Sequence, residues 1–506
     1  MRYANYNKLF TKNFRQSLDC HKTDRNLNTL VIGGPGTGKT RGFVWPNLMQ
    51  ANTSFIVLDP KGESYRKTAG YLSRQGYKIK AIDYIRLDPN MSHYNPFVYL
   101  AGDLDVQRLA TNIYKNTTPA KSASTDPFWD QAGEILLKAL MFYLWAWAPA
   151  EEQNFSFVLE MIRAGTVPTE EGNEEYVSRL DALFEMLKEE HPEDLSIHYY
   201  EHYKGAAGKT RMSIQISLTA RIEKYLLPSL AAITKDDDLD LYRFGEEKTV
   251  LYCLVPDNDK SFNFIIGMLY TQLFQILYHQ ADWVHGGSLP VPVQFIMDEF
   301  ANVHLPDGFL ELLATMRSRK ISVSMIIQDL TMLKKRYEKE WAALAACCDT
   351  VLYLGGGEEE TLKWISGKLG KETITVDSNS ENRSFTHGSS THSEQLTGRE
   401  LMAPNEVAGM PNKDCILFMR GEKPIYDQKL VLTKHPCYKQ MERYEALRPM
   451  ELYRKDSSLG GVSVIKIGDI PEGMPVFDLS KMTFEELQEA IKQMEEENGS
   501  IKSVNQ

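Results

Sequence analysis

Short apolar runs rich in β-branched residues alternate with longer helical patterns over much of the chain. The strand-like runs lie at residues 29–33, 55–59, 78–83, 249–255, 293–298, 322–328 and 350–355. Short strands separated by helical patterns are typical of a parallel sheet with crossover helices. The sequence therefore predicts an α/β fold with a mostly parallel central sheet.

Strand signals fade between about residues 103 and 233. Helical patterns occupy this stretch instead, at residues 126–145, 178–191 and 210–227. Since strand signals resume at residue 249, the economical interpretation is a helical domain inserted into the sheet domain. The predicted domains are a sheet domain in two parts over 1–102 and 233–435, an inserted all-α domain over 103–232, and an acidic C-terminal tail over 436–506.

Three further segments can be predicted from the sequence of the last third of the chain. Residues 373–398 are rich in Ser, Thr and Asn and lack apolar periodicity, so we expect a mobile loop in which His387 and His392 are solvated rather than metal-bound. Residues 415–432 indicate a closing β-hairpin. In the tail, residues 483–494 predict an amphipathic helix with a capping box, which packs on the body or docks a partner.

The composition is that of a folded globular protein with more than one domain, since the 506 residues are 42% hydrophobic and 25% charged. A net charge of −11 excludes a general attraction of the surface to nucleic acid but leaves a local basic channel open. The six cysteines form no CxxC pair, which favours the cytosol over a disulfide scaffold or zinc ribbon. The apolar run 135–150 is too short to span a membrane and contains Lys138, so it indicates a buried helix.

The strongest chemical signal is GGPGTGKT, which follows the first strand and precedes a helical pattern. It satisfies the P-loop pattern G-x-x-x-x-G-K-[ST], in which backbone N–H groups wrap phosphates at a helix N-terminus. Lys39 would contact the β- and γ-phosphates of ATP, and the Thr40 hydroxyl would ligate Mg²⁺. The letters recur at Gly208-Lys209-Thr210, but no strand precedes them, so we expect no site there. The predicted nucleotide-binding residues are Gly33, Gly34, Pro35, Gly36, Thr37, Gly38, Lys39 and Thr40.

A second signal is the strand pattern 293–298, which ends in Asp298 and Glu299. Open α/β sheets bind ligands at the carboxyl ends of their strands. Asp298 is therefore predicted to hold Mg²⁺ and its water shell, and Glu299 to orient or deprotonate the attacking water. Behind a P-loop, this pair indicates a Walker B motif and predicts ATP hydrolysis in addition to binding.

Two weaker signals concern the same chemistry. Arg317 and Arg319 precede the strand pattern 322–328, and Gln328 ends it. A cation near the γ-phosphate offsets transition-state charge, and an amide at the end of a strand can sense that phosphate. The residues alone nevertheless favour a simpler interpretation, in which Arg317 and Arg319 are surface arginines and Gln328 is a strand-end cap. The turn Asp59–Glu63, within the motif LDPKGE, lies at the same predicted sheet edge. A functional role and a merely structural turn are equally compatible with it.

Together these segments resemble the TraG-like coupling proteins of type IV secretion and conjugation, from about Thr29 to Leu432. The resemblance implies a RecA-like ATPase that assembles as a hexamer around a central channel, with the all-α domain facing the cytoplasm and handling cargo. It also implies that Arg317 is an arginine acting in trans and that Gln328 is a sensor. The segments that carry the resemblance are GGPGTGKT, FVWPNLM, FIVLDPKGE, YNPF, FIMDEFAN, MRSRKISVSMIIQ and LTGRELMAPNEVAGMPNKDCILFMRGEKPI.

The resemblance further implies a protein that brings relaxase-bound single-stranded DNA, or protein effectors, to type IV secretion channel components at the inner face of the cytoplasmic membrane. Typical members carry transmembrane helices before the P-loop, where this chain has about thirty polar residues. We therefore expect a soluble chain whose anchor is absent or supplied by a partner. Two alternatives stay open, a hexameric double-stranded DNA translocase and a nucleotide-switched receptor that docks protein with little hydrolysis.

Overall fold

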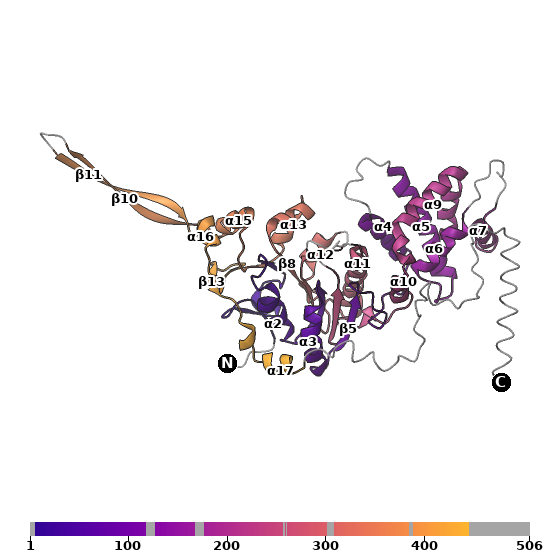
Figure 1. Cartoon of the computed structure of the whole chain (residues 1–506), viewed down its shortest axis with the longest axis horizontal. Coiled ribbons are helices and arrows are strands. Elements are labelled where there is room, and N and C mark those ends of the chain that lie inside the picture. The colour runs from indigo at the N-terminus through magenta and orange to yellow at the C-terminus, as the bar shows by residue number, and fades with distance from the viewer. Residues whose placement is uncertain are drawn as a thin grey trace, which may run out of the picture. The chain divides into compact units, whose positions relative to one another are not determined.

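The computed structural model describes residues 6–117, 127–166, 177–256, 259, 261–300, 308–383 and 388–444 (Figure 1). The amphipathic helix predicted at 483–494 lies outside these residues, as does His387, and the side chain of His392 is not described either.

Nine strands of the described residues form one sheet, in the order β13-β12-β9-β3-β8-β7-β4-β6-β5. The seven strands from β9 to β5 in that order are parallel, whereas β12 pairs antiparallel with β9, and β13 with β12. The mostly parallel sheet is confirmed, and each predicted strand is present within two residues of its expected bounds. The strands are β3 (Thr29–Ile32), β4 (Ser54–Asp59), β5 (Lys78–Asp83), β6 (Thr249–Leu254), β7 (Val293–Met297), β8 (Ile321–Ile327), β9 (Thr350–Tyr353), β12 (Asp414–Met419) and β13 (Ile425–Gln428).

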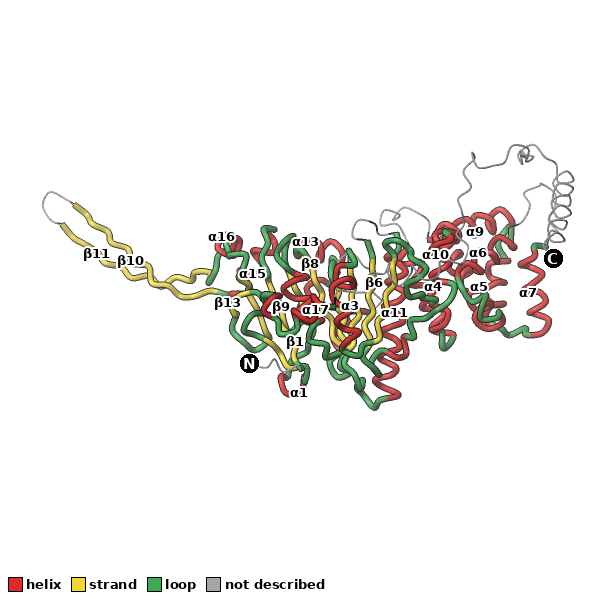
Figure 2. The backbone as a smooth tube through the Cα atoms, turned by 60° about the horizontal axis from the view of Figure 1, so that its bottom comes forward, coloured by secondary structure: helices red, strands yellow, loops and turns green. Residues whose placement is uncertain are grey.

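Both faces of this sheet are buried, which is why its strands read as continuous apolar runs rather than alternating ones. Along β3, Val31 joins the core on one face, while Leu30 and Ile32 join the core on the other. Helices pack on both faces (Figure 2). One face is covered by α2 (Trp45–Leu48), α3 (Glu63–Arg74) and α17 (Tyr438–Arg443), and the other by α11 (Asn263–His279), α12 (Phe309–Thr315), α13 (Leu330–Arg336), α14 (Trp341–Ala346) and α15 (Glu359–Leu369).

The regular elements that the structure describes between β5 and β6 are helices, as the fading strand signals predict. The three predicted helical patterns correspond to α5, α7 and α9. Lys138 of α5 pairs with Glu134 one turn earlier, at 2.8 Å, which accommodates its charge in a mainly apolar helix. The helices are α4 (Asp103–Thr117), α5 (Pro127–Trp147), α6 (Phe155–Ala164), α7 (Arg179–Glu190), α8 (Leu195–Lys204), α9 (Gly208–Ile222) and α10 (Pro228–Thr234).

Among the helices that the structure describes, none is both long and apolar enough to cross a bilayer. Ahead of β3, the strands β1 (Asn7–Leu9) and β2 (Arg15–Ser17) form an antiparallel pair that the short helix α1 (Cys20–Thr23) follows. Near the end of the described residues, α16 (Pro404–Ala408) precedes β12.

The prediction of a mobile loop over residues 373–398 is wrong, because β10 (Lys371–Arg383) and β11 (Gly388–Glu400) form an antiparallel pair there. Threonine, valine and isoleucine favour extended backbone, so the segment has the propensity for strands. None of the described side chains of this pair is buried, and those of Thr373, Thr375 and Leu396 are exposed. Since the described part of the pair has no buried face, no alternation of apolar and polar residues marks it in the sequence.

Candidate functional site

A cavity of about 790 Å³ opens at the carboxyl ends of β3, β4, β7 and β8. Parallel sheets bind ligands at this edge, because the loops after several strands meet there. Most of the predicted site residues contribute to its wall. The lining residues are Gly34, Pro35, Gly36, Gly38, Lys39, Thr40, Arg41, Asp59, Pro60, Lys61, Glu63, Asp298, Glu299, Gln328 and Met332.

The P-loop, residues 33–40, forms one wall of the cavity. Gly36 and Gly38 have φ angles of 74° and 90°, which glycine adopts without strain. A Cβ atom added to Gly33 would lie 2.5 Å from Oγ1 of Thr37, so a side chain does not fit at that position. Nζ of Lys39 donates to the carbonyl oxygen of Gly33 at 2.8 Å, which holds the ammonium group on the loop. The loop therefore combines the backbone conformation and the cation that phosphate binding requires.

Thr40 and Asp298 meet at the base of this cavity, although 258 positions separate them in sequence. Thr40 begins the π-helical turn η1 (Thr40–Val44), which continues into α2. Its hydroxyl donates to Oδ2 of Asp298 at 3.1 Å, and Oδ1 of Asp298 accepts from the backbone N–H of Glu299 at 3.1 Å. A hydroxyl and a carboxylate at one point are oxygen donors of the kind that Mg²⁺ takes.

Glu299 and Gln328 are also in contact. Nε2 of Gln328, directly after β8, donates to Oε1 of Glu299 at 3.0 Å. Glu299 has a φ angle of 56°, which is uncommon for a residue with a side chain and concentrates at functional sites. The amide thus fixes a carboxylate that lines the same cavity as the P-loop, where it could receive a proton from a water molecule.

Negative charge accumulates in the cavity opposite Lys39. Burial, reinforced by the neighbouring charge of Glu299, raises the pKa of Asp298 to about 6. Burial also raises the pKa of Asp59 to about 6, with a contribution from Asp298, against the opposing effect of an N–H bond from Tyr65 at 2.8 Å. A cation in the cavity would relieve this repulsion between carboxylates.

These features fit a magnesium nucleotide. The P-loop supplies the wall for the phosphates, and Thr40 and Asp298 supply oxygen ligands for the metal beside it. No cluster of three or more His, Cys, Asp or Glu side chains suited to a metal occurs in the described ranges.

The turn after β4 contributes residues that the sequence left undecided. Asp59, Pro60, Lys61 and Glu63 line the cavity because β4 lies beside β7 in the sheet. The motif LDPKGE was the available signal, but its relevance depends on the strand order, which the sequence does not supply. Arg41 and Met332 also line the cavity, and no sequence signal singled them out.

Arg317 does not reach the cavity of its own chain. It precedes β8, whereas Gln328 follows it, and seven strand residues at about 3.3 Å each separate the two ends by roughly 20 Å. Nη2 of Arg317 instead donates to the carbonyl oxygen of Cys20 at 2.9 Å. The nearby Arg319 pairs with Asp282 at 2.7 Å.

The comparisons with known proteins agree on one protein family. The family model described as "Type IV secretory system Conjugative DNA transfer" matches residues 5–449. VirD4 of Rhizobium rhizogenes is 23% identical over 420 residues, which cover 80% of this chain and 58% of that protein. TraG of Rhizobium radiobacter is 22% identical over 417 residues, which cover 78% of this chain and 60% of that protein. The chain thus spans about three fifths of the length of these relatives.

The fold also matches solved structures. The unbound bacterial conjugative coupling protein TrwBdeltaN70 superposes with a TM-score of 0.57 at 17% identity, covering 80% of this chain and 85% of that one. TrwB in complex with ADP and Mg²⁺ superposes with a TM-score of 0.56, at the same identity and coverage. With the family model matched over nearly all of the described residues, the chain belongs to the type IV secretion conjugative DNA transfer family of coupling proteins.

Proposed function

We propose that the chain hydrolyses ATP and uses it to drive single-stranded DNA with its relaxase, or protein effectors, through a type IV secretion channel. In this proposal it acts at the cytoplasmic face of the membrane beside the channel components, and the all-α domain over residues 103–232 handles the cargo. One observation carries the proposal, namely a single cavity in which the P-loop faces Asp298, Glu299 and Gln328.

Each of these residues has a role that its contacts support. Lys39 binds the β- and γ-phosphates after its ammonium group leaves the carbonyl of Gly33. Thr40 and Asp298 hold Mg²⁺, which neutralises phosphate charge when bound. Glu299 orients the attacking water and accepts its proton, and Gln328 holds that carboxylate in place through the bond at 3.0 Å.

Arg317 acts, in this proposal, on the nucleotide of a neighbouring copy. The strand β8 separates it from its own cavity by roughly 20 Å, and an arginine side chain is far shorter than that. A closed homo-hexamer would bring the amino edge of one sheet to the nucleotide of the next copy, so that ring closure becomes a condition for full turnover.

The decisive experiment measures ATP hydrolysis by the purified chain without nucleic acid, with single-stranded DNA and with duplex DNA, while light scattering records the oligomeric mass. Lys39→Ala serves as the inactive variant. The matched control is Lys423→Ala, because Lys423 is an exposed lysine of the sheet domain, outside the cavity and outside residues 103–232. We expect stimulation by single strands that Lys39→Ala abolishes and Lys423→Ala leaves intact.

Other outcomes would contradict parts of the proposal. Equal or greater stimulation by duplex would favour a double-stranded DNA translocase. Equal turnover in Glu299→Gln and wild type would favour a nucleotide-switched receptor, because the carboxylate would then have no chemical role. An unstimulated, near-zero rate in a verified hexamer would refute DNA-coupled hydrolysis.

A further inference from the structure

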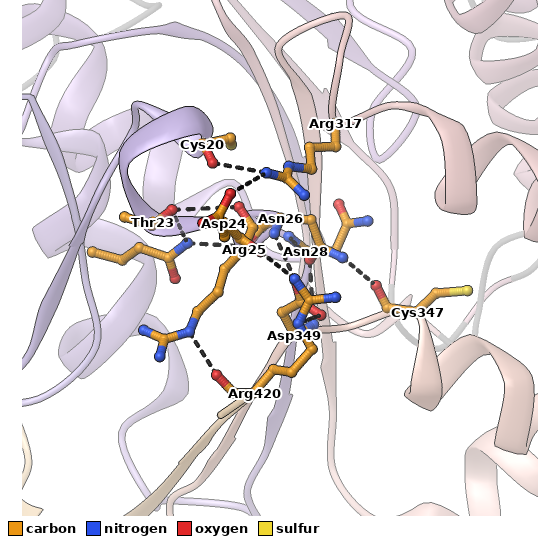
Figure 3. Close-up of polar contacts among 11 residues, drawn as sticks. Cys20, Thr23, Asp24, Arg25, Asn26, Asn28, Arg317, Cys347, Asp349 and Arg420 are labelled. Carbon is orange, nitrogen blue, oxygen red and sulfur yellow. Dashed lines mark hydrogen bonds and ion pairs between the residues drawn. The ribbon is translucent and has the colours of Figure 1, made fainter. Parts of the chain in front are cut away.

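The turn that carries Arg317 lies at the amino edge of the sheet, against the segment that precedes β3 (Figure 3). The turn joins α12 to β8 and is closed by a bond from the N–H of Lys320 to the carbonyl of Arg317 at 3.2 Å. Lys320 adopts a φ angle of 58°, so the turn has a specific and strained backbone. The segment Cys20–Asn28 contacts this turn at several points.

One edge of the Arg317 guanidinium group is held by this segment. Nη2 donates to the carbonyl oxygen of Cys20 at 2.9 Å and lies 3.6 Å from Oδ1 of Asp24. The other two guanidinium nitrogens have no hydrogen bond within the described part of the chain, and the side chain is 37% exposed. The contacts therefore orient the group and leave its remaining donors available to a second partner.

Asn28 holds the two flanks of the same turn. Its buried side chain donates from Nδ2 to the carbonyl oxygen of Leu313 at 3.0 Å, and its Oδ1 accepts from the N–H of Val323 at 3.0 Å. Leu313 lies in α12 and Val323 in β8, so one amide joins both ends of the connection that carries Arg317.

The segment is itself fixed to the sheet through Asp349, just before β9. The buried carboxylate of Asp349 accepts from the N–H of Asn26 at 2.6 Å and pairs with Arg420 at 3.3 Å. Arg420 also donates to the carbonyl of Asp24. The geometry of Arg317 thus depends on the segment, and the segment depends on the edge formed by β9 and β12.

We propose that Cys20–Asn28 is a positioning element for Arg317, which sets its orientation toward the nucleotide of a neighbouring copy. This inference rests on the proposed trans role of Arg317. Its consequence is that a displacement of the residues ahead of β3 changes turnover without touching the nucleotide cavity, because the segment contacts the arginine and not the P-loop.

The test compares Asp24→Ala and Asn28→Ala with wild type in the full chain, measuring kcat and KM for ATP. The matched control is Lys363→Ala, which removes an exposed ion pair within α15, with Glu359 at 2.6 Å, and touches neither the segment nor Arg317. We expect kcat to fall about twofold in Asp24→Ala, which loses one exposed ion pair, and about tenfold in Asn28→Ala, which loses two buried hydrogen bonds. KM for ATP should be unchanged in both variants. Each substitution is repeated in an Arg317→Ala background, where it should have no further effect.

A second measurement is independent of assembly. Hydrogen exchange of peptides covering residues 313–323 should accelerate in Asn28→Ala and not in Lys363→Ala, even in a monomeric preparation. Unchanged exchange, additive loss in the Arg317→Ala background, or a rise in kcat for Asp24→Ala would each overturn the positioning role. If Arg317→Ala alone kept full activity in a verified hexamer, the proposed trans role would fail instead, and this inference with it.

Discussion

Replacing Asp298 by asparagine should make the nucleotide-free chain more stable while abolishing its response to a magnesium nucleotide. The carboxylate is partly buried beside Glu299 and Asp59, and no basic side chain of the described residues is bonded to it. An asparagine amide can occupy the same place, because its Oδ1 can accept from the N–H of Glu299 and its Nδ2 can donate to the Thr40 hydroxyl. The substitution removes charge and keeps both contacts.

The magnitude follows from the raised pKa of Asp298. A rise from 3.8 to about 6 means that the folded chain binds a proton more tightly than the unfolded chain. The free energy of unfolding therefore falls as pH rises through this interval, by about 1.4 kcal/mol per pH unit. Above pH 7 the ionised carboxylate costs about 3 kcal/mol, so Asp298→Asn should recover about 3 kcal/mol at pH 7.5 and only about 1 kcal/mol at pH 4.5.

The assay is urea denaturation at both pH values, with thermal melts in the presence and absence of Mg²⁺ and ADP. The matched control is Asp83→Asn, a buried aspartate that also ends a strand but pairs with Arg86 at 2.8 Å. Removing that charge should destabilise the chain, by about 1–3 kcal/mol. Mg²⁺–ADP should raise the melting temperature of wild type and leave that of Asp298→Asn unchanged.

Two results would refute this reasoning. If Asp298→Asn destabilised the nucleotide-free chain at pH 7.5, the carboxylate would have to be stabilised by its surroundings rather than strained by them. If the gain in free energy were the same at both pH values, its origin would lie outside the ionisation of Asp298.

Three further predictions concern other parts of the chain. Glu299→Gln should bind nucleotide with wild-type affinity and lower kcat by about 10²–10⁴-fold, as equilibrium binding and steady-state hydrolysis would show. Burial lowers the pKa of Lys8 to about 7, so the free energy of unfolding should rise by about 1.4 kcal/mol per pH unit from pH 7 to 9, and the slope should flatten in Lys8→Met. Gly133→Ala should cost about 1–3 kcal/mol in urea denaturation, because its Cβ would lie 2.2 Å from Oη of Tyr114. Gly367→Ala, with open space around its Cβ, should instead gain up to about 1 kcal/mol from helix propensity.

The sheet could be predicted because a central strand that is buried on both faces needs apolar residues at successive positions. Each such strand therefore appears in the sequence as a continuous apolar run. The P-loop and the Asp298-Glu299 pair could be predicted for a related reason, since each follows such a run directly and so lies at a known edge of the sheet. At these positions the structure that the local sequence favours is the structure that the tertiary environment requires.

The remaining features depend on the order of the strands, which no local pattern encodes. The turn Asp59–Glu63 joins the cavity only because β4 pairs with β7. The contact of Arg317 with Cys20 joins residues 297 positions apart. The β10–β11 pair escaped prediction for a different reason, because the exposed side chains at its base leave no periodicity to detect.

The strand order also gives β8 a particular importance. It carries Gln328 at its carboxyl end, in contact with Glu299, and the Arg317 turn at its amino end. All seven residues of β8 are buried between β3 and β7, so the strand is a rigid connection of roughly 20 Å rather than a flexible one. If Arg317 acts in trans, one strand joins the nucleotide cavity of its own chain to that of the next copy. Communication around a ring would then depend on how firmly Cys20–Asn28 holds the far end of that strand.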